Sequence, residues 1–61
     1  MKIYENAAEH AKDCSAQELL ENFVERESIR AYSDALSYRQ EAESRGLEIV
    51  QDYRSAVIRG R

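Results

Sequence analysis

Apolar residues recur at helical spacing along most of this chain. Between residues 15 and 45 neither proline nor glycine interrupts the sequence, and many apolar positions lie three or four residues apart. This pattern predicts one long helix over about residues 15–45. The apolar residues that share its main face are Ala16, Leu20, Phe23, Val24, Ala31, Ala35, Tyr38 and Ala42.

A second apolar group lies about a quarter to a half turn away from that face and consists of Ile29, Tyr32 and Leu36. Together the two groups cover an arc of about 180° in the middle of the helix, whereas a helix with one buried face needs only about 100°. One neighbouring helix cannot cover so wide an arc. The pattern therefore indicates that a second polypeptide completes the core.

Sequence signals for helix starts precede the long helix. Asn6 can cap a short first helix, and Glu9 follows three residues later in the position of a capping box. Ser15 and Glu18 form a complete capping box, because the serine oxygen can accept an orphan amide while the glutamate returns to the amide of the cap. A new helix is therefore predicted after a joint at residues 12–15.

The segment after Arg45 is predicted to fold back as a second helix. Gly46 is expected to take the left-handed conformation that ends many helices. We predict a helical hairpin whose second helix covers about residues 47–59; the alternative of one continuous helix through Gly46 costs about 1 kcal/mol relative to alanine. The apolar stripe of the second helix consists of Ile49, Val50, Tyr53, Ala56 and Val57.

A break inside the long helix is the other open alternative. Residues 25–28 are polar, and Ser28 could cap a fresh helix that begins at Ile29. Such a break would turn one long helix into two shorter ones and would change which apolar residues share a face.

The composition favours helices throughout. The chain has no proline, only two glycines, and neither an Asn-Gly nor an Asp-Gly turn, so strands are not expected. We predict an all-α fold in one small domain over residues 1–61, with a short N-terminal helix followed by the helical hairpin. Two hairpins would bury the wide apolar arc in a four-helix bundle, so a homodimer is the expected state.

Length and charge narrow the classes of function. A chain of 61 residues buries a small core and is marginal as a lone monomer. The net charge of −3 argues against unspecific binding to duplex nucleic acid, although the residues after 27 carry a balance of +1. No segment has the apolar length of a secretion signal or a membrane span, and the single cysteine suits a reducing compartment, so a cytoplasmic protein is expected.

The residues that carry chemistry do not form a catalytic or metal-binding pattern. His10 and Cys14 are four positions apart and Asp13 is close by, but two soft ligands without a second pair are too few for a structural zinc site. We interpret His10 as solvated and Cys14 as packed against Leu19 in a hydrophobic staple. The sequence has no Gly-rich phosphate loop. We expect no metal, no cofactor and no enzymatic activity.

These observations predict a small regulatory or accessory protein that acts through helix-mediated contacts with another protein. In size and simplicity the chain is similar to the short accessory proteins of phages and other mobile elements. The residues expected at the interface are Ile29, Tyr32, Leu36, Tyr38, Tyr53 and Val57.

The alternative function is a nucleic-acid-binding regulator. It would combine a helix-turn-helix unit, made by the break near Ser28, with arginines near the C-terminus. The arginines expected to contact phosphates or an acidic partner are Arg45, Arg54, Arg59 and Arg61.

Overall fold

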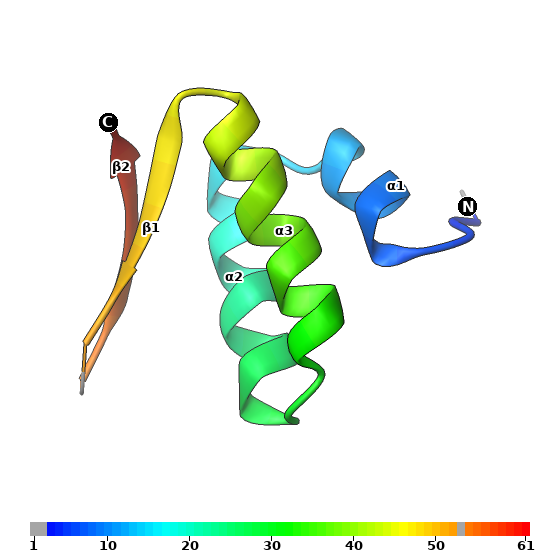
Figure 1. Cartoon of the computed structure of the whole chain (residues 1–61), viewed down its shortest axis with the longest axis horizontal. Helices are drawn as coiled ribbons and strands as arrows, with labels where there is room; N and C mark the ends of the chain where they lie inside the picture. The colour runs from blue at the N-terminus through cyan, green and yellow to red at the C-terminus, as the bar shows by residue number, and fades with distance from the viewer. Residues whose placement is uncertain (1–2, 53) are drawn as a thin grey trace.

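Three helices are followed by a two-stranded antiparallel sheet (Figure 1). The computed structural model describes residues 3–52 and 54–61. The fold is therefore mixed α/β, and the predictions of an all-α fold, of a helix at about 47–59 and of a four-helix bundle are wrong. The elements are α1 Ala7–Asp13, α2 Ala16–Ser28, α3 Tyr32–Ser44, β1 Leu47–Gln51 and β2 Ala56–Gly60.

The predicted starts of the first two helices are confirmed. The side chain of Asn6 accepts a hydrogen bond from the backbone N–H of Glu9 at 2.9 Å. The capping box of α2 is complete, since Glu18 donates its N–H to Ser15 Oγ at 3.2 Å and accepts the N–H of Ser15 at 2.8 Å. These short-range contacts fix where α1 and α2 begin.

The segment predicted as one long helix is two helices joined by a tight turn. The alternative of a break near Ser28 is confirmed, although the new helix begins at Tyr32 and not at Ile29. Ser28 does not cap it, because its hydroxyl donates to the carbonyl of Glu25 at 2.7 Å. Arg30 has a φ of 63°, and this left-handed residue turns the chain so that α3 runs back along α2 (Figure 1).

Gly46 ends α3 as predicted, with a φ of 77° in the left-handed region. The chain that follows is a β-hairpin. The strands pair with Leu47 opposite Gly60 and Gln51 opposite Ala56. Because side chains alternate along a strand, Leu47, Ile49 and Ile58 share the face that packs on the helices.

The hairpin forms because its residues favour strands and its turn is locally stabilised. Ile49 and Val50 in β1 and Val57 and Ile58 in β2 are β-branched, and such residues pack well on a pleated sheet. The carboxylate of Asp52 accepts the backbone N–H groups of residues 54 and 55 at 2.9 and 3.0 Å, and this Asx turn takes the place of an Asn-Gly signal.

The core lies where α1, α2, α3 and the inner face of the hairpin meet. The helices α2 and α3 lie side by side, α1 packs on α3, and the hairpin covers one side of the pair (Figure 1). Leu20, Leu47 and Ile58 pack around this core. The buried residues are Ala11, Cys14, Leu19, Phe23, Ala35, Tyr38, Ala42 and Ile49.

Within the described part of the chain, none of the helices has both the length and the apolar character that crossing a bilayer requires.

Candidate functional site

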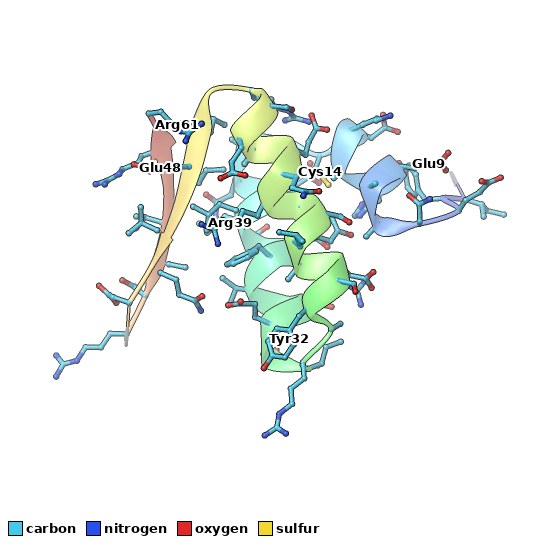
Figure 2. The ribbon with its side chains drawn as sticks, in the orientation of Figure 1. Glu9, Cys14, Tyr32, Arg39, Glu48 and Arg61 are labelled. Carbon is cyan, nitrogen blue, oxygen red and sulfur yellow. The ribbon has the colours of Figure 1, made fainter. Side chains whose placement is uncertain are left out.

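Four large apolar residues are exposed where α2 turns into α3, and we call them the turn-end surface. They come from the second half of α2, the connecting turn and the first half of α3, at the opposite end of the helix pair from Gly46. Figure 2 shows Tyr32 at this end. The exposed fractions are 39% for Val24, 60% for Ile29, 61% for Tyr32 and 50% for Leu36.

Helix periodicity explains why these residues stay uncovered. The side of α3 that faces the core carries the buried residues Ala35, Tyr38 and Ala42. Tyr32 and Leu36 are one turn apart and lie on a different side of the helix. The hairpin begins at the far end of α3 and packs through Leu47 and Ile58. The part of the chain that the structure describes therefore leaves the turn-end surface open.

The outer face of the hairpin carries a second, smaller apolar feature. Val50 and Val57 lie directly opposite each other and are 36% and 47% exposed. Beside them, the Arg59 side chain donates to Glu48 Oε1 at 3.0 Å across the strands. Arg59, which we expected to contact phosphate or an acidic partner, is thus paired with a carboxylate of its own chain.

The structure divides the predicted interface residues. Ile29, Tyr32, Leu36 and Val57 are exposed and available to a partner. Tyr38 is 1% exposed and belongs to the interior, so a partner cannot reach its ring. The remaining predicted residue, Tyr53, lies outside the described residues.

Arg45, another arginine that we expected to contact phosphate, makes its hydrogen bonds within the fold. Its guanidinium donates to the carbonyl of Cys14 at 2.7 Å and to those of Ala11 and Lys12 at 3.0 and 3.2 Å. These carbonyls lie at the C-terminal end of α1, where orphan acceptors and the helix dipole favour a cation. A further bond to Glu41 at 3.0 Å fixes the side chain on α3. Arg45 thus ties α1 to the end of α3.

Arg54 and Arg61 are exposed at opposite ends of the hairpin, beside the turn and at the chain end. Arg54 therefore lies apart from the other predicted arginines, whereas the backbone N–H of Arg61 donates to the carbonyl of Gly46 at 3.0 Å, next to Arg45. The helices α2 and α3 run side by side (Figure 1), whereas a helix-turn-helix unit crosses its helices at about 90–120°. The packing of α2 and α3 therefore differs from the helix-turn-helix unit that the nucleic-acid alternative assumed.

His10 lies inside an aromatic cluster and not in open solvent as we expected. Its Nδ1 is 2.8 Å from the hydroxyl of Tyr38, and its ring centroid is 4.8 Å from that of Tyr4. The edge-on contact with the Tyr38 ring has a centroid distance of 5.7 Å. These contacts hold the imidazole between the N-terminal segment and α3.

A pocket of about 280 Å³ opens beside this cluster, between α1, α2 and α3. Burial raises the pKa of the Tyr38 hydroxyl, while a hydrogen bond and the positive charge from Arg26 oppose that shift. Arg26 and Asp34 are half-buried. The described residues that line the pocket are Tyr4, Asn6, Ala7, His10, Arg26, Asp34 and Tyr38.

Cys14 is a buried free thiol beside His10, with Sγ 3.7 Å from Nε2. Burial raises the pKa of this thiol, the negative charge of Glu18 adds to the shift, and the positive charge of Arg45 opposes it. Among residues 3–52 and 54–61, no three His, Cys, Asp or Glu side chains are grouped so that they could hold a metal ion.

Sequence reasoning did not identify the pocket. Its lining comes from three helices and the segment before α1, and Tyr38 is 28 positions from His10. Local spacing therefore contained no signal that would bring Arg26 and Asp34 to one place.

Comparison with known proteins gives no family. A scan against protein-family models, a search of curated proteins and a search of solved structures each found no match.

Proposed function

We propose that this chain is a small non-enzymatic accessory protein that acts through protein–protein contact and forms a homodimer through the turn-end surface. The observation that carries the proposal is the exposure of Ile29, Tyr32 and Leu36 on neighbouring elements. Covering large apolar side chains releases free energy, and aromatic residues in an apolar patch are typical centres of binding. A clustered apolar surface on so small a chain is typical of an interaction site.

The modest core supports the same proposal. Of the buried residues, Ala11, Cys14, Ala35 and Ala42 are small and contribute little apolar area each. A domain of this length removes only about 60% of its unfolded surface from water. Association adds apolar burial that the single chain lacks.

The charges next to the turn-end surface favour a second copy as the partner. Glu27 near the end of α2 and Arg30 in the turn lie next to this surface and carry opposite charges. Two identical surfaces meet around a two-fold axis, and a border with both signs of charge allows opposite charges to face each other. A border of one sign would instead favour a partner of the opposite sign.

The proposed compartment is the cytoplasm. The support is the free thiol of Cys14, since thiols remain reduced in that compartment.

Sedimentation equilibrium of wild type and Leu36→Glu tests the proposal. Wild type is expected to have the mass of a dimer, and Leu36→Glu that of a monomer, because a charge at the interface would lose its hydration. The variant should keep its helical circular dichroism, since Leu36 is half-exposed in the single chain.

Gln17→Glu is the matched control, because Gln17 is exposed in the first turn of α2, at the other end of the helix pair from the turn-end surface, and the substitution adds the same charge. It should remain a dimer. Wild type that sediments as a monomer at about 100 µM, where a standard interface would be largely occupied, contradicts the proposal.

A further inference from the structure

The pocket between α1, α2 and α3 contains two half-buried charges of opposite sign. Arg26 of α2 and Asp34 of α3 both line it. The structure records no ion pair between them, and among residues 3–52 and 54–61 the side-chain carboxylate of Asp34 has no hydrogen-bond partner. Over the same residues, the Nε of Arg26 is buried and has no hydrogen-bond partner.

Charged groups that are partly removed from water need partners. A buried donor or acceptor without a hydrogen bond is uncommon in folded proteins, because its desolvation is not compensated. A hydrogen bond from Arg26 to the Tyr38 hydroxyl uses only part of the donor capacity of the guanidinium. The pocket wall therefore offers a ligand one positive charge from Arg26 and one negative charge from Asp34.

The remaining walls restrict the size and character of a ligand. The ring of His10 contacts the rings of Tyr4 and Tyr38, and Ala7 contributes only a methyl group. A volume of about 280 Å³ lies below the roughly 300–1,000 Å³ typical of sites for drug-sized molecules. The pocket thus suits a molecule of few heavy atoms.

We propose that this pocket binds a small zwitterion of the α-amino acid class, with its carboxylate on Arg26 and its ammonium group on Asp34. A simple anion would leave Asp34 without a counter-charge and would be repelled by it. A simple cation would leave Arg26 without a counter-charge and would be repelled by it. A zwitterion satisfies both charges at once. The site uses residues outside the turn-end surface, so it is independent of the proposed dimer.

Amide NMR titration of the wild-type chain tests the proposal directly. Each standard amino acid is added to about 20 mM, which covers the weak affinity expected of a site with few contacts. At least one is expected to give saturable shifts at residues around 7, 10, 26, 34 and 38. The absence of saturable shifts for every amino acid overturns the proposal.

Two variants that each remove one charge test the roles of the charges. Arg26→Gln and Asp34→Asn should each weaken binding of the best amino acid by at least about 10-fold, because each removes a charge-assisted contact. Arg39→Gln and Glu43→Gln are the matched controls, since these residues form an exposed pair on α3 at 3.9 Å. The controls should bind as wild type does. Unchanged binding by both pocket variants, with native circular dichroism, contradicts the assignment.

Acetate and ethylammonium separate a zwitterion site from a site for one charge. Each is titrated alone into wild type over the same concentrations. Both should bind at least about 10-fold more weakly than the amino acid, because each makes only one of the two contacts. If acetate binds as tightly as the amino acid, Asp34 takes no part and the proposal fails.

Discussion

At the scale of single residues, Arg45 joins elements that are far apart in the sequence. Its guanidinium bonds to carbonyls 31 to 34 positions earlier in the chain. We expect Arg45→Gln to lower the free energy of unfolding by about 1–2 kcal/mol, since hydrogen bonds from charged groups contribute about that much after allowance for partial exposure. Urea unfolding measures this change.

The control for Arg45 is Arg39→Gln, because Arg39 makes only an exposed pair with Glu43. Its effect should be below about 0.5 kcal/mol. Hydrogen exchange should also show faster opening of α1 in the Arg45 variant. Equal effects of the two substitutions would mean that Arg45 does not hold α1 in place.

Cys14 gives a second prediction at this scale. Its thiol is buried, and burial raises its pKa above the ordinary value. The reactive thiolate is therefore scarce in the folded chain. We expect the thiol to react with a disulfide reagent at about pH 8 much more slowly in the native chain than in urea. Similar rates in the two conditions would contradict the burial of Cys14.

Residue-scale features could be predicted only where the partners are close in sequence. The caps formed by Asn6 and by Ser15 with Glu18 involve residues three positions apart, so the sequence alone indicated them. The contacts of His10 and Arg45 depend on how α3 folds back, so no local pattern contained them.

At the scale of elements, Gly46 determines where α3 ends and where the hairpin begins. Its φ of 77° is strained for any residue with a Cβ, although a Cβ would meet nothing within 4 Å. We expect Gly46→Ala to cost about 1 kcal/mol of unfolding free energy, through the backbone alone. Gly60→Ala, which also meets open space, should cost less than about 0.5 kcal/mol. Thermal unfolding compares the two, and equal losses would contradict this account.

The turn of the hairpin makes stability depend on acid pH. Hydrogen bonds from the backbone of Arg54 and then Ser55 lower the pKa of Asp52. Its contribution to stability is therefore present above the unfolded pKa of about 4 and is lost as pH falls through the lower folded value. The cap formed by Ser15 lowers the pKa of Glu18 and adds in the same direction.

The variant Asp52→Asn separates the contribution of Asp52 to the pH dependence of stability from that of the other acidic groups. An asparagine can form the same Asx turn but does not titrate in this range. The variant should unfold at nearly the wild-type temperature at pH 7 and lose less stability between about pH 5 and pH 2. Parallel pH profiles for the two proteins would show that Asp52 makes no such contribution.

The hairpin was missed because its sequence fits two periodicities. Ile49, Val50, Ala56 and Val57 share a face when placed on a helix, and no Asn-Gly pair marked a turn. The structure places Ile49 inside and Val50 outside, as a strand requires. β-Branched residues around Asp52 and Ser55 were the signal that favoured the correct structure.

At the scale of the whole molecule, the position of exposed apolar surface was closer to the prediction than the fold itself. The arc of Ile29, Tyr32 and Leu36 was expected to remain uncovered by the chain's own segments, and these residues are at least half-exposed. The prediction depended on spacing within one short stretch. The element that covers the helices was predicted wrongly as a helix, because its type depends on the contacts between Asp52 and Ser55 and not on that stretch.

The central claim is that a second copy of the chain covers the turn-end surface. Isotope-filtered NMR on a mixture of labelled and unlabelled chains tests it most directly, because only contacts between copies give a signal. The account predicts intermolecular contacts that involve Ile29, Tyr32 and Leu36. A spectrum without intermolecular contacts to these three residues, at a concentration where the chains are mixed and folded, would contradict it.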